Sequence, residues 1–195
     1  MTDPTRASLI LRVKDARDKE AWSSFVDIYQ PLIEGYGRKR GLQAEDAADL
    51  TQEVMQTVAS AIQRFEYERA KGPFRSWLLR ITYHKLGHFF QRRKRHSQGS
   101  GETAMPKLLE QQPDVRAIRE FDRDYKRRLF EWACEAVEKE FQSSTWDAFR
   151  RTMIDEEQPR HVAEALGMST SAVYQAKSRV LARVREKVLE IVDDE

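Results

Sequence analysis

Apolar side chains recur every three or four residues along almost the whole 195-residue chain, whereas the alternation typical of β-strands is almost absent. Such spacing places apolar side chains on one face of an α-helix. The 8 glycines and 6 prolines lie mostly between the periodic segments, where they would separate one helix from the next. We therefore predict an all-α fold made of two small helical domains joined by a flexible linker.

Several helices are expected before residue 66. A short helix is predicted over residues 8–14, and Asp18 is placed to cap a second one. Pro31 suits the first turn of a further, separate helix, which Gly41 would end. The strongest apolar stripe in the front half predicts a helix over residues 44–65.

A helix over residues 74–95 completes the first predicted domain. The stretch from 96 to 106 is rich in Gly, Ser and other polar residues, which is the chemistry of a linker. The predicted parts are a first domain at 1–96, a linker at 97–113 and a second domain at 114–195.

The second half again shows helical spacing. Its predicted helices are one over 115–141, one capped by Ser144 or Thr145 and ending at Ile154, one that begins at Gln158-Pro159, and one over about 169–191.

Residues 160–180 have the spacing of a helix-turn-helix. Ala163 is the small residue that allows two helices to cross closely, and Gly167 tolerates positive φ in the turn. Ser169 or Thr170 would cap the second helix. The apolar residues expected to hold the pair together are Val162, Leu166, Val173, Ala176 and Val180. A packed helix pair with no DNA partner is the alternative.

The exposed face of this second helix would present polar groups suited to a DNA major groove. Arg185 and Lys187 continue the positive charge along the helix. For Tyr174, partial burial in the core is the alternative. The residues predicted to contact DNA here are Ser169, Thr170, Ser171, Tyr174, Gln175, Lys177, Ser178, Arg179 and Arg183.

Charges are segregated within the first domain, although the net charge of the chain is only +2. Residues 41–63 hold four acids and no Lys or Arg, whereas residues 71–98 hold eight Lys or Arg and no acid. This pattern suggests one basic and one anionic partner. The acids fall away from the apolar stripe and are expected to be solvated; they are Glu45, Asp46, Asp49 and Glu53. A solvated surface without a partner is the alternative.

Basic and aromatic residues alternate along the 74–95 segment. Basic side chains attract the nucleic-acid backbone, and aromatic rings can stack on unpaired bases. We expect Trp77 and Phe89 to lie in the core, and Tyr83, His84 and Phe90 to be exposed. This combination is typical of a protein that captures single-stranded DNA.

No catalytic, cofactor or metal site is expected. Nothing in the pattern predicts the burial that paired catalytic carboxylates need, and His84 and His88 lack a third ligand at a recognised spacing. The single cysteine, Cys134, excludes an intrachain disulfide and is expected to be a small buried side chain. Because no 18-residue apolar run or signal-peptide pattern is present, we expect a cytoplasmic protein without membrane contact.

The order of these motifs resembles the extracytoplasmic-function sigma factors, the smallest members of the sigma-70 family. The resemblance rests on Asp46-Ala-Ala-Asp-Leu-Thr-Gln-Glu-Val54, on Phe74-Arg-Ser-Trp-Leu-Leu-Arg-Ile81, and on the basic run, linker and helix-turn-helix that follow. It covers nearly the whole chain, from about Ser8 to Ile191. Trp146, Phe149 and the segment AVYQAKSRVLARVRE are similar to a branch common in planctomycete-like bacteria.

The resemblance implies a transcription initiation factor, not an enzyme, with the core of bacterial RNA polymerase and promoter DNA as partners. Asp46, Asp49, Gln52 and Glu53 would dock on the clamp helices of the β′ subunit. The second domain would meet the β flap and read the −35 element, and an anti-sigma factor is an open further partner. The 63–73 loop and the 74–95 helix would recognise and melt the −10 element, with one base flipped into a pocket. The −10 residues would be Arg75, Arg80, Tyr83, His84, Lys85, Arg92 and Arg93.

Two departures from the family pattern concern the DNA-facing helices. His84 stands where many relatives carry Asn, and Tyr174-Gln175-Ala176 stands where many carry Lys-Ser-Arg. Ala176 cannot make an arginine's contact, so Lys177 and Arg179 would take over that role. A free-standing helix-turn-helix regulator is the alternative function, although it leaves the acidic and the basic–aromatic helices unexplained.

Overall fold

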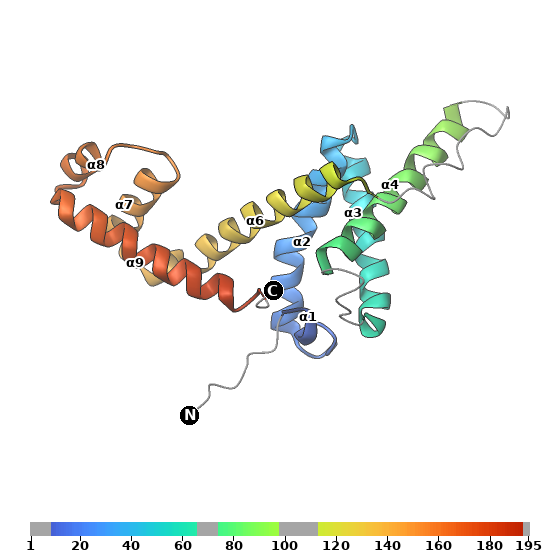
Figure 1. Cartoon of the computed structure of the whole chain (residues 1–195), viewed down its shortest axis with the longest axis horizontal. Helices are drawn as coiled ribbons and strands as arrows, with labels where there is room; N and C mark the ends of the chain where they lie inside the picture. The colour runs from blue at the N-terminus through green and yellow to red at the C-terminus, as the bar shows by residue number, and fades with distance from the viewer. Residues whose placement is uncertain (1–8, 66–73, 98–112, 193–195) are drawn as a thin grey trace. The chain divides into compact units, whose positions relative to one another are not determined.

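The computed structural model describes residues 9–65, 74–97 and 113–192, and every regular element within these ranges is helical (Figure 1). The predicted all-α fold is therefore confirmed. Most of the predicted linker and of the 63–73 loop lies outside the described residues. The helices are α1 (Leu9–Arg12), α2 (Lys19–Lys39), α3 (Ala44–Ala61), η1 (Ile62–Arg64), α4 (Phe74–Ser97), α6 (Val115–Val137), η3 (Glu138–Glu140), α7 (Ser143–Met153), α8 (Pro159–Leu166) and α9 (Thr170–Leu189).

Contacts between the helices divide the described chain into two units. The front unit comprises Ile10–Arg128, and the rear unit begins at Leu129 and includes Leu9. The division falls inside α6, because Phe121 and Tyr125 are buried in the front unit whereas the apolar residues from Leu129 on are buried in the rear unit. The predicted second domain, 114–195, begins earlier in the chain than this division.

Asp18 caps α2 as predicted. Its carboxylate accepts a hydrogen bond from the Ala21 N–H at 2.9 Å, and it also holds the Arg12 guanidinium at 2.9 Å. Both hydrogen bonds lower the pKa of Asp18, with the Arg12 bond as the larger cause. Satisfying an N–H at the helix start in this way anchors the first turn.

The prediction that Pro31 begins a separate helix is wrong, because α2 continues through it. An internal proline costs about 3 kcal/mol, partly because it lacks the N–H that would bond to the carbonyl four residues earlier. That carbonyl belongs to Asp27, and the Arg128 Nε donates to it at 3.1 Å. Burying one large apolar side chain stabilises by about 1.5–3 kcal/mol, and α2 buries a full stripe that includes Phe25 and Ile33. The burial outweighs the proline.

Two glycines set the turn between α2 and α3. Gly41 has φ +90°, which L side chains rarely adopt, and it follows the end of α2 as predicted. At Gly37 the helices approach so closely that a Cβ atom would lie 3.1 Å from Leu50 Cδ2. From there α3 runs beside both α2 and α4 (Figure 1).

The start of α4 is held by aromatic rings. Phe74 lies with its ring centroid 5.3 Å from that of Phe65 and 5.8 Å from that of Phe25. Trp77, which was expected in the core, is half-buried against Phe65, and Phe89 is also half-buried. Phe90 is exposed as predicted. Rings from three helical segments thus fix the beginning of the basic helix.

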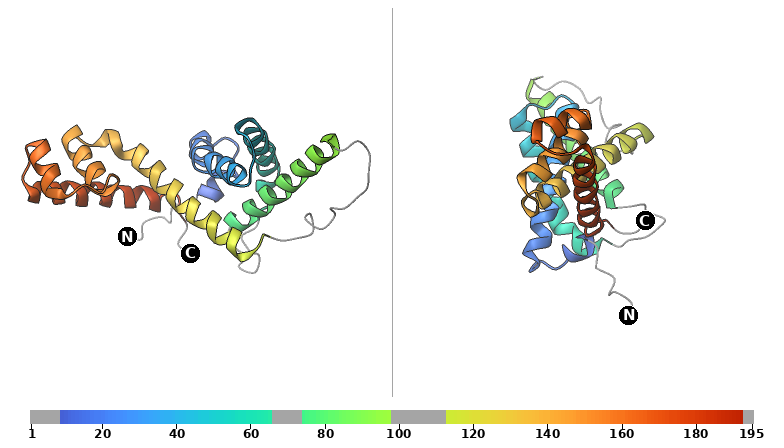
Figure 2. Two further views of the ribbon diagram at one scale, coloured as in Figure 1. Left: turned by 90° about the horizontal axis from the view of Figure 1, so that it is seen from above. Right: turned by 90° about the vertical axis from the view of Figure 1, so that its left-hand side faces the viewer.

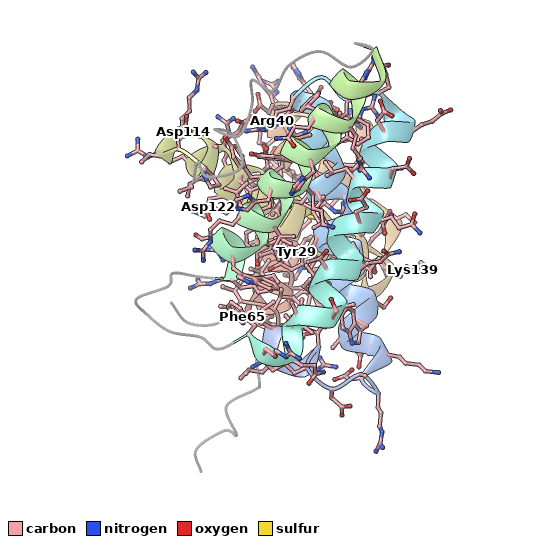
Figure 3. The ribbon with its side chains drawn as sticks, turned by 90° about the vertical axis from the view of Figure 1, so that its right-hand side faces the viewer. Tyr29, Arg40, Phe65, Asp114, Asp122 and Lys139 are labelled. Atoms are coloured by element: carbon pink, nitrogen blue, oxygen red, sulfur yellow. The ribbon has the colours of Figure 1, made fainter. Side chains whose placement is uncertain are left out.

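Helix α6 begins at a cap that the sequence analysis missed. The Asp114 carboxylate accepts from the Ala117 N–H at 2.7 Å (Asp114 is labelled in Figure 3). The prediction that this helix reaches residue 141 is wrong: it ends at Val137, a 3₁₀ turn follows, and Phe141 has extended dihedral angles. An apolar residue at helical spacing therefore lies just beyond the helix.

In the rear unit α7 and α8 pack against α9 (Figure 2, left). The predicted cap at Ser144 or Thr145 is wrong, since both lie inside α7 and Gln142 precedes the helix without a side-chain cap. The predicted start at Gln158-Pro159 is confirmed, because Pro159 is the first residue of α8. There its missing N–H breaks no helical hydrogen bond.

Candidate functional site

The acidic side chains of α3 do not share one environment. Asp46 and Glu53 are seven residues apart, two helical turns, and both turn toward α4. The Arg92 Nη2 lies 2.7 Å from Glu53, the Lys85 Nζ lies 3.6 Å from it, and the Arg93 Nη1 lies 3.4 Å from Asp46. These pairs show that α3 and α4 run antiparallel.

The expectation that all four acids are solvated is therefore wrong for two of them. The Asp46 and Glu53 side chains are only 32% and 35% exposed because the basic side chains of α4 lie over them. The hydrogen bond from Arg92 lowers the pKa of Glu53, and burial opposes this only in part. Glu45, Asp49 and Gln52 are exposed as expected, and no ion pair with a described side chain is recorded for them.

Arg75, at the start of α4, contacts α6. Its Nε lies 3.1 Å from an Asp122 carboxylate oxygen, and its guanidinium carbon lies 4.7 Å from the centre of the Tyr125 ring. Figure 3 shows Asp122 on α6 beside α4. Burial by itself would raise the pKa of Asp122, but a hydrogen bond from Lys126 and the charge of Arg75 together lower it. Sequence reasoning missed Asp122 and Tyr125, because no spacing rule links a helix to one more than forty residues away.

Most predicted −10 cations thus contact a carboxylate of the same chain. Arg75 contacts α6, whereas Lys85, Arg92 and Arg93 contact α3. The expectation that Tyr83 and His84 are exposed is wrong, because both are half-buried on this helix, as is Arg80, and the Tyr83 ring lies edge-on to His84. The two surfaces that the sequence assigns to different partners contact one another.

The α8–α9 pair has the predicted local geometry. Gly167 has φ +63°, and the Ser169 hydroxyl accepts from the Ala172 N–H at 3.1 Å, which caps α9. Ala163 is 4% exposed where the helices cross. The shared core is Ala148, Val162, Ala163, Val173 and Ala176, with Leu166 and Met168 packed against it. Ala176 belongs to this core, so an arginine there would not be a surface residue.

The outer face of α9 is open to solvent. Tyr174 is 58% exposed, which excludes the alternative that it is core. Lys177 is half-buried. The other exposed predicted residues are Ser169, Thr170, Ser171, Gln175, Ser178 and Arg179. Among the described side chains, no ion pair is recorded for Arg179.

Arg183 differs from the rest of its predicted set. Its Nε and Nη2 donate to the two carboxylate oxygens of Glu140 at 2.6 and 3.0 Å, and its Nη1 donates to Glu186 at 3.1 Å. The hydrogen bond from Arg183 lowers the pKa of Glu140. A two-pronged pair of this kind fixes the guanidinium plane, so Arg183 joins α9 to the η3 turn. Lys187 likewise pairs with Glu190 at 2.8 Å and lies over the Trp132 ring.

No group of three or more His, Cys, Asp or Glu side chains in the described part of the chain is arranged to hold a metal ion. Cys134 is buried, and burial raises the pKa of its thiol to about 11. None of the described helices is both long and apolar enough to cross a membrane.

Residues 25–96, which include most of α2, all of α3 and nearly all of α4, match the family model for sigma-70 region 2. The chain carries a sigma-70 region 2 domain. This domain indicates an RNA polymerase sigma factor, a protein that acts in transcription initiation with the polymerase core and promoter DNA as partners. No curated protein and no solved structure matches the chain.

The matched segment coincides with the part of the front unit where the charges are segregated. The acids of α3 and the bases of α4 both lie inside the region 2 domain, whereas α8 and α9 lie outside the match. Asp122 on α6 also lies outside it, so the region 2 domain is contacted by a carboxylate from beyond its own bounds.

Proposed function

We propose that the chain is a sigma factor of the extracytoplasmic-function type, from the branch common in planctomycete-like bacteria. It would direct core polymerase to specific promoters and assist DNA melting, without enzymatic activity, in the cytoplasm. One observation carries the proposal: a region 2 domain and an α8–Gly167–α9 pair with an open polar face occur in one chain. The functional parts would be residues 1–96, a linker at 97–113 and residues 114–195.

The polymerase would dock on α3. Asp49 and Gln52 are exposed and would contact the β′ clamp, while Asp46 and Glu53 are paired with cations of α4 and would exchange partners. An anti-sigma factor would compete for this surface. Asp49 has no recorded ion pair with a described side chain that would have to break on binding a basic partner, which favours it as the first contact.

Promoter DNA would contact both units. The exposed α9 face, with Tyr174, Gln175 and Arg179, supports reading of the −35 element in a major groove. On α4, Arg80, Tyr83 and His84 are partly accessible, which supports capture of the opened −10 element. Four further cations would contact the −10 element once DNA phosphates replace their carboxylate partners: Arg75, Lys85, Arg92 and Arg93.

Co-purification with core polymerase tests the proposal. We expect the Asp49→Arg variant to bind core at least about tenfold more weakly, because it places a cation against a basic partner. Glu138→Arg is the matched control, since it makes the same charge change at an exposed acid that lies outside α3. If wild type does not bind core, or if Asp49→Arg binds like the control, the free-standing regulator becomes the better function.

Permanganate footprinting tests the melting role. We expect Tyr83→Ala to reduce the reactivity of unpaired thymines near −10 while leaving formation of the closed complex largely intact, because an aromatic ring stabilises unstacked bases by about 1–3 kcal/mol. His88→Ala, on the same helix and exposed, is the control. A footprint identical to wild type for Tyr83→Ala would exclude Tyr83 from melting.

A further inference from the structure

The first half of α6 holds cations of the front unit through carboxylates on two flanks of the helix. The Asp124 carboxylate holds the Lys39 Nζ at 2.7 Å, Glu120 lies 3.4 Å from Arg40 and 3.8 Å from Lys39, and Asp122 holds Arg75. The three cations come from the end of α2 and the start of α4. Figure 3 shows Arg40 and Asp122 on the side of the front unit where α6 passes.

Aromatic rings anchor this half-helix between the acids. Phe121 and Tyr125 are four residues apart, and they are 1% and 4% exposed. The Tyr125 ring stacks on Tyr29 with centroids 5.6 Å apart, and Phe121 lies edge-on to Tyr36 at 5.7 Å. The rings fix where the half-helix lies, and the carboxylates on both sides of them neutralise the cations.

One buried group in this contact has no hydrogen-bond partner among the residues that the structure describes. The Tyr36 hydroxyl is buried and has no hydrogen-bond partner in the described part of the chain, and burial raises its pKa to about 12. The Arg40 guanidinium lies 3.4 Å from the centre of the same ring. Burying a hydroxyl without a partner costs free energy, so the packing around Tyr36 is less favourable than a fully paired arrangement.

We propose that Lys39, Arg40 and Arg75 form a binding surface for the phosphate backbone of DNA, and that residues 115–128 of α6 cover it in the free protein. The carboxylates of Glu120, Asp122 and Asp124 take the positions that phosphates occupy when the cover is displaced. Partly exposed ion pairs are weak and exchange readily with other anions. The inference rests on the proposed function in one respect: it identifies the anion as DNA.

The proposed surface adds two cations to the residues predicted to contact the −10 element. Arg75 belongs to that set, whereas Lys39 and Arg40 come from a different helix and were not assigned to any partner. Glu120 and Asp124 hold Lys39 and Arg40 while Asp122 holds Arg75, so all three cations contact the same half-helix. Displacing α6 would therefore release three cations together and lengthen the DNA path along the front unit.

The test uses the full chain without polymerase and measures its binding to fluorescein-labelled single-stranded and duplex oligonucleotides. The uncovered variant is Glu120→Gln, Asp122→Asn and Asp124→Asn. The matched control is Glu20→Gln, Glu34→Gln and Glu45→Gln, which removes the same number of acids from the same unit, and no contact with α6 is recorded for these side chains. We expect the uncovered variant to bind about tenfold more tightly than the control, with a log–log salt slope steeper by about 2 to 3 for duplex DNA.

A second set of variants removes the cations. Lys39→Ala with Arg40→Ala should weaken DNA binding strongly in the uncovered background and only slightly in wild type, because Glu120 and Asp124 already neutralise both side chains there. Tyr125→Ala, which weakens the anchor without changing charge, should also raise DNA affinity. Circular dichroism checks that each variant is folded.

The outcomes separate this inference from the proposed function. Two results would overturn the proposal that α6 covers this surface, even if the protein still directs core polymerase to promoters. One is equal DNA affinity of the uncovered and control variants. The other is an equal effect of the cation substitutions in the uncovered and wild-type backgrounds. A gain confined to single-stranded or to duplex DNA identifies which form the surface binds. A gain in DNA affinity with no polymerase binding supports the surface and overturns the sigma-factor proposal.

Discussion

The front and rear units differ in how accessible their predicted DNA-contacting residues are. Those of the front unit are mostly paired with carboxylates, whereas those of the rear unit are mostly exposed. In the front unit, Arg75, Lys85, Arg92 and Arg93 lie against carboxylates from α3 and α6. In the rear unit, the outer face of α9 is exposed from Ser169 to Arg179 apart from its core positions and the partly buried Ala172 and Lys177. Only Arg183 among the predicted rear residues has a recorded carboxylate partner.

The contrast shows where binding would require rearrangement. Partly exposed ion pairs contribute roughly 0.2–1 kcal/mol each, so several of them together restrain the front unit without locking it. In the proposed function, the exposed residues of α9 would contact duplex DNA without breaking a recorded ion pair of the rear unit. We infer that duplex recognition is available in the resting protein, whereas the front unit binds DNA only as its carboxylates find other partners.

The largest expected effect concerns the stability of the rear unit alone. Ala163→Leu places a large side chain in the close crossing of α8 and α9, and overpacking a core costs about 1–3 kcal/mol or more. Hydrogen exchange should rise in α8 and α9 but not in α3, and duplex binding should fall. Ala165→Leu, two residues away and exposed, should change neither. A similar rise in α3 would show that the two units unfold together.

Arg179 and Arg183 provide the next comparison, since both are predicted phosphate contacts on one helix. Arg179→Ala should lower duplex affinity and reduce the log–log salt slope by about 0.9, the value for one phosphate contact. Arg183→Ala should change the slope much less, because Glu140 and Glu186 already neutralise that side chain. If both substitutions changed the salt slope equally, the ion pairs of Arg183 would not reduce its contact with DNA.

A smaller effect is expected when one α3 carboxylate is neutralised. Glu53→Gln frees Arg92 and Lys85 and should raise the affinity of the polymerase-free protein for a short single strand by up to about fivefold, the equivalent of one exposed pair. Asp49→Asn removes the same charge from the same helix without breaking a recorded pair. If both variants gain equally, net charge explains the result and the pairs do not restrain the front unit.

The smallest effect is a pH dependence of stability. The pKa of Glu53 is lowered from its usual 4.5 by Arg92. A lowered folded-state pKa contributes stability above the unfolded value, and this contribution is lost as the pH falls through the folded value. Between about pH 5 and pH 3, wild type should lose a fraction of a kcal/mol more than Glu53→Gln, as measured by urea unfolding, because solvent screens the pair. Glu45→Gln should follow wild type across the same range.

The local structure of the chain was largely predictable from its residues. Apolar spacing predicted the helices over 44–65 and 74–95 within a few residues, and the roles of Asp18, Gly41, Gly167 and Ser169 follow from capping and turn chemistry. These features depend on neighbours within one or two turns. The predictions at Pro31 and at residue 141 were wrong because packing against distant residues decides whether a helix continues or ends there.

The candidate site also combines features that the sequence predicts with features that depend on tertiary packing. Its residue types, their segregation by charge and the exposed pattern of α9 are properties of the sequence, because a helix places every third or fourth side chain on one face. Only the tertiary structure decided that Glu53 meets Arg92, that Asp122 meets Arg75 and that Glu140 meets Arg183. Each of these pairs joins side chains about forty residues apart. Coulomb attraction selects such partners only after the packing of apolar faces has brought the helices side by side.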